Sequence, residues 1–423
     1  MTVTASNSGG AASTGFRVTV TGREQGVTVS SRAALLAAIT ASVAGDVIRI
    51  APGVYDRFIW PKNTSHKLTL TPADLDNPPI LRGIWISQNP DDFFPAQSPT
   101  GTWAKNLTID GLRFQAELMT RMQQADGKIV NITGEDGRGY GWRADYSYPG
   151  VTSLGESSGF VGIKLGSGCS DILIQNCLFE QFAKGLNVQC DRATVQHCEF
   201  SEMCEDGVII WGGEDLAFQY NIWSKSRGVS LQAAQAYGWK NDEPVHQDFF
   251  QIACNSASQF CTRLNITYNV INDDSERVHG LLLNNAYVGG STAANLQGSR
   301  HRNVTVENNF LKVTHTTALQ LTNVVGLTAR RNKVIRSKVV AGSTKNDVAI
   351  IVGAWGSLDA QNCDDITVQN NVSRKYKGPW KDSWVWTGNL ETNDEAVLPP
   401  GWVEIRPELV KSGRKAGRYG NPG

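Results

Sequence analysis

The sequence has no excess of charge of either sign and no long apolar run. Lys and Arg together number 40, and Asp and Glu together number 40, which gives a formal net charge of zero and a pI of about 7. A neutral chain has no basic surface that would favour nucleic acid or an anionic membrane. No stretch of about 18 apolar residues is present to form a transmembrane helix. The first residues, MTVTASNSGGAASTG, also lack the basic start and apolar centre of a Sec signal peptide. We therefore expect neither a nucleic-acid nor a membrane partner.

Cysteine pairs of the zinc-binding type are also absent. The eight cysteines include no C-x-x-C pair, so the sequence does not favour a structural zinc site. Several cysteines fall on apolar repeat positions, which predicts mostly free, buried thiols. Cys254 and Cys261 bracket a loop and are the best candidates for a disulfide bridge.

One short pattern is repeated along most of the chain. Each repeat opens with alternating apolar and polar positions, reaches a polar triplet and closes on an apolar residue. The repeats are 106–114, 171–179, 192–200, 216–223, 264–271, 303–310, 327–334 and 365–372. Aligning the triplets gives the column Cys177, Cys198, Asn221, Asn269, Asn309, Asn332 and Asn371. Neighbouring members lie 21 or 23 residues apart where no loop intervenes.

This period predicts a solenoid whose coils are built from short strands. Alternation over about five residues indicates a strand with one buried and one exposed face. A repeat of about 22 residues leaves no room for a helix in each unit. We expect an all-β fold, a single-stranded right-handed parallel β-helix, in which each coil buries its apolar face against the next. The Asn column then becomes an internal ladder of side-chain amides, with Cys177 and Cys198 in the same place in earlier coils.

The chain is expected to fall into three regions. They are an N-terminal lead and edge strand (1–30), a parallel β-helix catalytic domain (31–375) and an irregular C-terminal cap or tail (376–423). Ser31 and the apolar spacing of 31–39 predict a helix that caps the N-terminal end of the solenoid. Long loops that carry function are expected at 87–104, 134–160 and 231–247.

The segment GDVIRIAPGVYD (45–56), followed by coils of the form xITVxNNxF, resembles the pectate-lyase-type right-handed parallel β-helix superfamily. That superfamily includes polysaccharide lyases, polygalacturonase-type hydrolases, alginate epimerases and phage tailspike depolymerases. The resemblance covers roughly residues 30–375 and is specific for the fold, because the superfamily hosts several reactions. It implies a polysaccharide substrate. The epimerase motif DPHD is absent and no lyase Lys/Arg signature matches, so no catalytic residue is carried over.

A second strand follows each Asn turn, and aligning these strands brings titratable side chains into two columns. One column reads Phe182, Cys204, His246, Arg277, His315 and Lys345, and the other reads Lys184, Asp206, Asp248, His279, Thr317 and Asp347. Adjacent coils stack about 4.8 Å apart, so consecutive members of a column become neighbours. We therefore expect one patch about three coils tall, made of Asp206, His246, Asp248, Arg277, His279 and His315, in which all but His315 are catalytic candidates.

Cleavage of a uronic-acid polymer by β-elimination fits these groups. The reaction needs a cation to neutralise the C6 carboxylate, a base for the C5 proton and an acid for the leaving oxygen. Arg277 would neutralise the carboxylate. His246 or His279 would be the base, because histidine titrates near neutral pH.

Hydrolysis by two carboxylates that flank the glycosidic bond is the second possibility. Asp206 and Asp248 would supply the pair, with Glu205, Glu243 and Glu276 in reserve. Elimination is slightly favoured, because cationic and imidazole groups outnumber the two aligned aspartates.

Further residues are expected to hold the sugar or a cation. Aromatic faces stack on sugar rings, and polar side chains bind their hydroxyl and carboxylate groups. The expected substrate-binding residues are Trp211, Tyr237, Trp239, Lys240, Gln251 and His315. The acidic turn 272–276 could hold Ca²⁺ through its carboxylates, although a solvated turn fits it better. No other cofactor is expected.

The leading hypothesis is a depolymerase that cleaves an acidic bacterial or algal polysaccharide by β-elimination. The alternatives are a glycoside hydrolase on the same fold and a non-catalytic carbohydrate-binding tailspike or structural protein. In the non-catalytic case, the Asp and His column would only bond backbone groups. Without a Sec signal, the protein is expected to be extracellular by another route or part of a phage tail. Tailspikes of this fold are usually trimers, which suggests a homotrimer.

Overall fold

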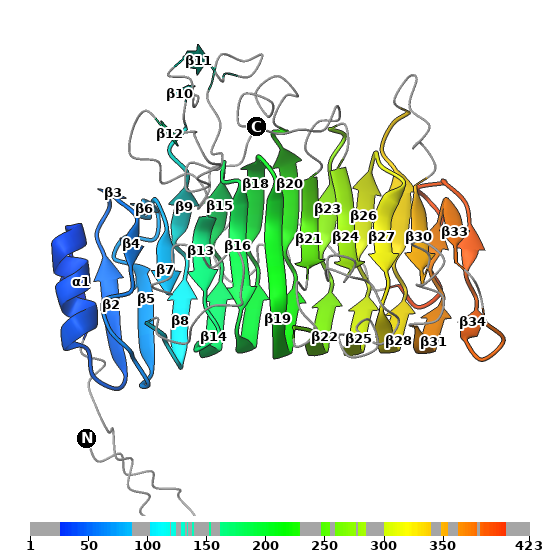
Figure 1. Ribbon diagram of the computed structural model, residues 1–423, viewed down its shortest axis with the longest axis horizontal. Helices are drawn as coiled ribbons and strands as arrows, with labels where there is room; N and C mark the ends of the chain where they lie inside the picture. Colours follow the sequence, from blue (N-terminus) through cyan, green and yellow to red (C-terminus); the bar gives the residue numbers. More distant parts are fainter. Residues whose placement is uncertain are drawn as a thin grey trace, which may run out of the picture.

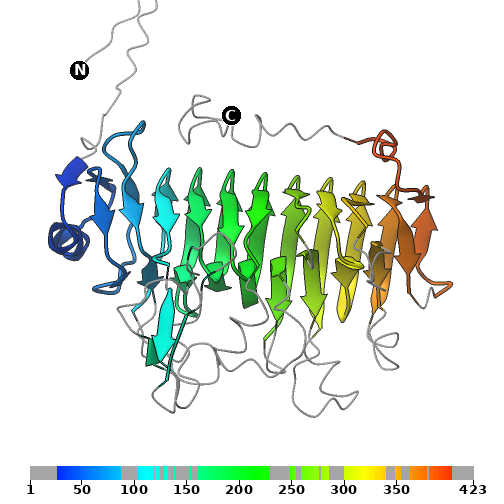
Figure 2. The ribbon, with the colours of Figure 1, turned by 90° about the horizontal axis from the view of Figure 1, so that it is seen from above.

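The computed structural model is an elongated cylinder of stacked coils (Figures 1 and 2). Helix α1 (Arg32–Ala41) lies at one end of the long axis, and strands β33 (Lys375–Lys377) and β34 (Val385–Thr387) lie at the other. The structure describes residues 26–86, 102–118, 120–123, 128–131, 133, 138, 152–153, 161–228, 247–253, 259–275, 278–284, 300–339, 348–353, 363–378 and 381–402. Within these ranges, no helix has the length and apolar character needed to cross a membrane.

Successive coils add one strand to each of three long parallel sheets, here called A, B and C in chain order. Sheet A consists of β1 (Gly26–Val29), β2 (Asp46–Ile50), β5 (Leu68–Pro72), β8 (Leu107–Asp110), β14 (Ser170–Gln175), β17 (Asp191–Gln196), the second half of β19 (Asp206–Gln219), β22 (Cys261–Thr267), β25 (His301–Glu307), β28 (Val324–Arg330), β31 (Asp364–Gln369) and β34. Sheet B consists of β3 (Val54–Tyr55), β6 (Ile80–Leu81), β9 (Arg113–Gln115), β15 (Leu178–Glu180), β18 (Glu199–Met203), β20 (Ile222–Ser226), β23 (Val270–Asn272), β26 (Phe310–Val313), β29 (Lys333–Arg336), β32 (Val372–Ser373) and β35 (Leu390–Glu391).

Sheet C carries the candidate site. It consists of β4 (Phe58–Ile59), β7 (Ile84–Ile86), β13 (Val161–Leu165), β16 (Lys184–Gln189), the first half of β19, β21 (Gln247–Ala253), β24 (Val278–Asn284), β27 (Thr317–Leu321), β30 (Ala349–Val352) and β33. A small antiparallel sheet of β10 (Arg121–Gln123), β11 (Ile129–Asn131) and β12 (Thr152–Ser153) stands off the cylinder between β9 and β13 (Figure 1). The parallel pairing in all three long sheets confirms the expected β-helix.

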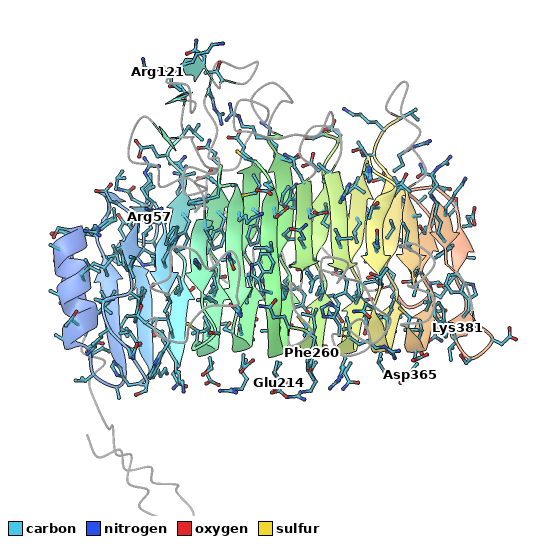
Figure 3. All side chains as sticks on the ribbon, in the orientation of Figure 1. Arg57, Arg121, Glu214, Phe260, Asp365 and Lys381 are labelled. Atoms are coloured by element: carbon cyan, nitrogen blue, oxygen red, sulfur yellow. The ribbon has the colours of Figure 1, made fainter. Side chains whose placement is uncertain are left out.

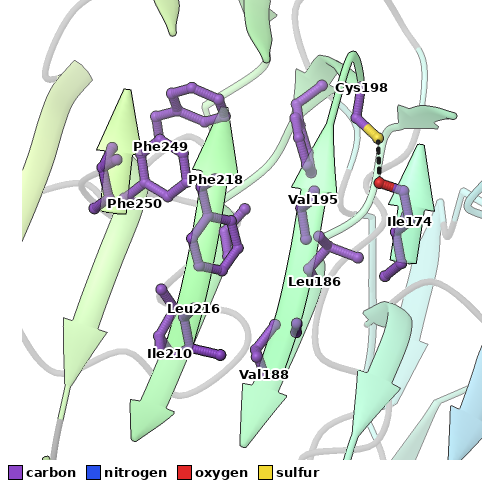
Figure 4. Close-up of a cluster of buried hydrophobic side chains, with 14 of the residues drawn as sticks. Ile174, Leu186, Val188, Val195, Cys198, Ile210, Leu216, Phe218, Phe249 and Phe250 are labelled. Atoms are coloured by element: carbon purple, nitrogen blue, oxygen red, sulfur yellow. Dashed lines mark hydrogen bonds between the residues drawn. The ribbon is translucent and has the colours of Figure 1, made fainter. Parts of the chain in front are cut away.

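Alternating burial within the strands produces one continuous core. In β14 the residues alternate between buried and half-buried positions, as the sequence pattern predicts. Aromatic side chains stack in register inside the cylinder, and the rings of Phe114, Phe179 and Phe200 follow one another at centroid distances of 4.9 Å. Further along the axis, Phe249 and Phe250 fill the same core (Figure 4). Each coil therefore becomes stable only by covering its neighbours.

The expected Asn ladder is confirmed. From Asn221 to Asn371, each later Oδ1 accepts hydrogen bonds from the backbone N–H and the side-chain amide of the preceding Asn, at 2.9 to 3.1 Å. Asn389 adds a further rung by accepting the same two bonds from Asn371. Cys198 stands in the same column, with its Sγ 3.8 Å from the carbonyl of Ile174 (Figure 4).

Helix α1 closes the N-terminal end of the core, as predicted. Ser31 is its N-cap, and the side-chain oxygen of Ser31 accepts a hydrogen bond from the N–H of Ala34 at 3.2 Å. Leu35 and Ile39 are fully buried in the core. The helix therefore covers the apolar end that an open solenoid would expose.

The C-terminal boundary expected at residue 375 is too early. β33, β34 and β35 pair with β30, β31 and β32, so the coils continue to Glu391. The following residues return to sheet B, where Asn393 Oδ1 accepts from the N–H of Arg336 and Glu395 pairs with Lys312 at 2.9 Å. Aromatic residues in this region interrupt the repeat pattern, so the last coil could not be recognised from the sequence.

The expected bridge between Cys254 and Cys261 is wrong. Cys261 is a free, buried thiol at the start of β22, and burial raises its pKa to about 12. Cys254 lies outside the described residues. The other described cysteines are also free and buried, which confirms the prediction for them.

His301 is a fully buried histidine at the start of β25. Its Nδ1 accepts a hydrogen bond from the backbone N–H of Cys261 at 3.0 Å, which requires an unprotonated nitrogen. Burial lowers the pKa of His301 to about 3. The folded chain therefore keeps this imidazole neutral in mild acid.

We expect His301 to make the protein less stable as the pH falls. An unfolded histidine has a pKa of about 6.5, so below that pH the unfolded chain binds a proton that the folded chain does not. The stabilising contribution of the neutral His301 is complete above about pH 6.5 and is lost progressively as the pH falls towards the folded pKa. At pH 5 the loss in the free energy of unfolding is about 2 kcal/mol. His301→Asn keeps an acceptor for Cys261 and should remove this part of the dependence. Urea midpoints of both proteins at several pH values between neutral and mildly acidic measure it, and parallel curves would disprove it.

Candidate active site

The corner between sheets B and C turns one column of side chains inward and the preceding column outward. A Cβ at Gly185 would lie 2.7 Å from the Phe200 ring, and one at Gly207 would lie 2.9 Å from Trp223, so this position faces the core. Phe249 holds the same position in β21 and packs in the core. Because neighbouring side chains point to opposite sides of a strand, the residue before each of these positions points away from these core contacts, although Lys184, Asp206 and Asp248 are themselves buried. Small residues or a core aromatic occupy this inward position, which is Gly185, Gly207, Phe249, Gly280 and Ala318 in successive coils.

The outward column consists of Lys184, Asp206, Asp248, His279 and Thr317, here called the corner column. Lys184 pairs in register with Asp206, and Asp248 pairs with His279. The backbone N–H of Asp248 lies 3.4 Å from Asp206 Oδ1, which joins the two pairs. The alignment of this column from the sequence is therefore confirmed for these residues.

Lys184 is the centre of a buried ion network. Its Nζ lies 2.6 Å from Asp206 Oδ2 and 3.1 Å from Glu205 Oε1. The side chains of Lys184 and Asp206 are 2% and 1% exposed. Burial raises the pKa of Asp206 to about 7, opposed by the ammonium of Lys184 and reinforced by the carboxylates of Glu205 and Asp248.

His279 and Asp248 form a pair at the next step of the column. His279 Nδ1 lies 3.0 Å from Asp248 Oδ1, within ion-pairing distance, although the two atoms are not aligned as a hydrogen bond. Asp248 is completely buried, whereas His279 is 9% exposed. A carboxylate beside Nδ1 favours the tautomer that carries its proton there, which leaves Nε2 as the basic nitrogen.

His315 lies beside the corner column and contacts His279. Its ring lies against the ring of His279, with centroids 4.0 Å apart and planes tilted by 33°. His315 is half-buried, and its Nδ1 accepts from the backbone N–H of Thr317 at 3.2 Å. The corner column therefore begins at a buried ammonium, Lys184, and at His279 it contacts the half-buried imidazole of His315 from the neighbouring column.

The corner column differs from the charged groups elsewhere on the molecule. Along the edge where sheet C passes into sheet A, Glu214 and Lys381 lie at the periphery (Figure 3). Arg263 pairs there with Glu214 and Asp215, and all three side chains are more than two-fifths exposed. Exposed pairs of this kind contribute little to stability. Among the described residues, the corner column brings the buried charged side chains of Lys184, Asp206 and Asp248 together.

Two of the expected substrate-binding residues lie on the outer face of sheet C. Gln251 pairs in register with Ile209 and Leu282, one position away from the core-facing Phe250. Trp211 packs with Ile209 in a cluster separate from the main core. The outer face therefore brings Gln251 and Trp211 onto the sheet that carries the corner column.

The remaining predicted site residues lie outside the described residues. These are His246, Arg277, Tyr237, Trp239, Lys240, Glu243 and Glu276. Lys184 was aligned with the column from the sequence but was not assigned a role. The alignment itself could have indicated a role for Lys184, since Lys184 stands one coil before Asp206.

The acidic turn proposed for Ca²⁺ has a structural role at Asp273. Asp273 Oδ2 accepts from Trp223 Nε1 at 2.7 Å, and Oδ1 accepts from the N–H of Ser275 at 2.8 Å. Across the part of the chain that the structure describes, no three His, Cys, Asp or Glu side chains gather as metal ligands would.

Comparisons with known proteins concern the fold. The family model described as "Right handed beta helix region" matches residues 155–334, and together with the parallel sheets it confirms the expected right-handed β-helix. No curated protein matches the sequence. Among solved structures, the chain is similar to an alginate lyase from Paenibacillus sp. str. FPU-7, at 10% identity over 87% of this chain and 98% of that chain, with a TM-score of 0.34.

Two further solved structures are similar at the same level. One is a mannuronic acid specific polysaccharide family 6 lyase from human gut microbiota, at 10% identity over 86% of this chain and 79% of that chain, with a TM-score of 0.42. The other is a pectate lyase from Bacillus sp. N165 in complex with trigalacturonate, at 11% identity over 85% of this chain and 91% of that chain, with a TM-score of 0.30.

Proposed function

We propose that the protein is a polysaccharide-degrading enzyme whose acid–base chemistry takes place at the corner column of sheet C. The observation that carries the proposal is the contact of His279 with Asp248 on one side and with His315 on the other. An imidazole between a buried carboxylate and a second imidazole is suited to move protons near neutral pH. The repeats resemble those of the pectate-lyase-type superfamily, which suggests the substrate class by analogy.

The reaction we propose is β-elimination within an acidic polysaccharide. His279 Nε2 takes the proton from C5 of a uronate, the electron pair forms the C4–C5 double bond, and the C4–O bond breaks. The leaving oxygen takes a proton from an acid, a role that we propose for His315, whose ring lies against that of His279. Arg277 is proposed, as from the sequence, to neutralise the C6 carboxylate.

Hydrolysis by Asp206 and Asp248 has less support. Asp206 is 1% exposed and is engaged by Lys184, so its carboxylate is poorly available to a glycosidic bond. A hydrolase needs both carboxyl groups beside the scissile bond. The same burial weakens a purely sugar-binding role for these two aspartates. Gln251, Trp211 and the other aromatic residues of the sequence prediction are proposed to bind the sugar.

Incubation with a panel of acidic and neutral polysaccharides tests the proposal. We expect products from at least one uronate-containing polymer, with equal yields of new reducing ends and of ultraviolet-absorbing unsaturated uronate, because elimination creates one of each per cleavage. New reducing ends without the absorbance would indicate a hydrolase. Binding without either product, across the panel, would favour the non-catalytic carbohydrate-binding alternative.

The wider assignments stay predictions. They are the homotrimer, the extracellular or phage-tail location and action without a cofactor. Sedimentation and activity after treatment with a chelator test the first and the third.

A further inference from the structure

We infer that Lys184 is a positioning residue of the proposed active centre, which holds Asp206 so that Asp206 fixes the strand carrying Asp248. The inference rests on the proposed function of His279. Lys184 stands three strands away from His279 along sheet C, so it acts through its neighbours. It does not itself touch the reacting atoms.

The contacts of Asp206 link the two halves of the network. Asp206 Oδ2 receives the ammonium of Lys184 at 2.6 Å, while Oδ1 faces the backbone N–H of Asp248 at 3.4 Å. The carboxylate therefore bridges a side chain on one strand and the backbone of another. The contact with Lys184 fixes the rotation of the Asp206 carboxylate and therefore the direction of Oδ1. Oδ1 in turn holds the backbone at the start of β21.

The position of Asp248 in turn determines the orientation of the His279 ring. The separation of 3.0 Å between Asp248 Oδ1 and His279 Nδ1 leaves little freedom for the backbone of β21 to shift. This pair is not aligned as a hydrogen bond in the present structure, and catalytic hydrogen bonds often tighten only when substrate binds. A small displacement of Asp248 would therefore change the tautomer and the direction of Nε2.

A stabilising role alone does not account well for Lys184. Removing an ammonium and a carboxylate from water is expensive, and well-packed apolar residues at such positions are often equally stable or more stable. In the same column one coil beyond His279 the chain has Thr317, which shows that this position does not require a charge. The buried ions occur where the column leads to His279.

The test compares Lys184→Met with Lys333→Met, a matched change of a buried lysine on sheet B that is 2% exposed. The first readout is ¹⁵N NMR of histidine-labelled protein, which reports the tautomer of His279. The second is kcat and KM on the polysaccharide that the panel identifies. For Lys184→Met we expect the Nδ1–H tautomer of His279 to give way to a mixture, and kcat to fall about tenfold to a hundredfold with KM little changed.

Lys333→Met is expected to leave both readouts at the parental values. If Lys184→Met also leaves the tautomer and kcat unchanged, the inference is overturned. If the parent cleaves no polysaccharide, the proposed function fails, while the tautomer comparison still decides whether Lys184 orients His279.

Lys184→Met is expected to lower the free energy of unfolding, because Asp206 and Glu205 lose their buried counter-ion. The double variant Lys184→Met/Asp206→Asn removes the pair together and keeps the shape of both side chains. We expect it to melt near the parent and still show the mixed tautomer and the low kcat. Parental tautomer and kcat in this folded double variant would mean that the pair serves stability only.

Discussion

Replacing His279 by glutamine is expected to lower the rate of polysaccharide cleavage by about a thousandfold, because the proposed base is lost. Glutamine has a similar reach and keeps a polar contact with Asp248, so the corner should retain its packing. His279 keeps only a small exposed surface, and its neighbours His315 and Asp248 are held by other elements. The measurement is the initial rate of unsaturated-uronate formation, with circular dichroism and thermal melting to establish that the coils are intact.

Asp248→Asn is expected to reduce the rate by about a hundredfold to a thousandfold. The amide can donate to His279 Nδ1, which stabilises the tautomer with its proton on Nε2 and removes the basic lone pair. This variant is nearly isosteric, so its effect separates charge and tautomer from packing. Raising the pH should not restore the rate, because the wrong tautomer is neutral already.

His197→Gln is the matched control for these variants. His197 is a half-buried histidine at the turn between sheets A and B, where its ring stacks on Tyr220 at 5.2 Å. It lies outside the corner column, so we expect parental cleavage. If His279→Gln and Asp248→Asn cleave as fast as His197→Gln, the corner column has no part in the chemistry.

The long sheets could be predicted from the sequence because every coil buries apolar side chains at equivalent positions against its neighbours. The column from Asn221 to Asn371 gives the spacing of the coils directly. The register of Asp248 with His279 comes from the strands that follow, where the apolar Phe250 pairs with Leu281. Asn389 continues that column 18 residues later in the segment TGNL, a signal that the aromatic surroundings obscured.

The direction of the corner column could not be obtained from alternation alone. Lys184 and Leu186 are two residues apart and would face the same side of a regular strand. In the structure, Gly185 and Leu186 both face core side chains, so the alternation is interrupted between them and Lys184 does not share the side of Leu186. Glycine recurs at this point, as at Gly185 and Gly207, because a Cβ there would contact core aromatic rings. The burial of Asp206 depends on groups from several coils, and no single repeat encodes it.

Interrupting the Asn ladder in the middle is expected to destabilise the protein strongly. Asn309→Ala removes the oxygen that accepts from the backbone N–H and the side chain of Asn269, and the amide that donates to the carbonyl of Ile266 at 2.8 Å. Asn309 is 2% exposed, so water replaces these bonds poorly. Leaving such groups unpaired costs about 1–3 kcal/mol each, and we expect a loss of about 3 kcal/mol in the free energy of unfolding.

Asn389→Ala provides the comparison at the hydrated end of the same ladder. Asn389 makes the same two acceptor bonds to Asn371 but is only half-buried. Water can replace its bonds, so we expect a loss of about 1 kcal/mol. Urea unfolding of both variants measures the difference in the free energy of unfolding. Equal losses would contradict the expectation that burial makes the interior hydrogen bonds of the ladder worth more than those at its hydrated end. A larger loss at Asn309 would instead locate the stabilisation in the interior coils, where each amide serves the coil before it and the coil after it.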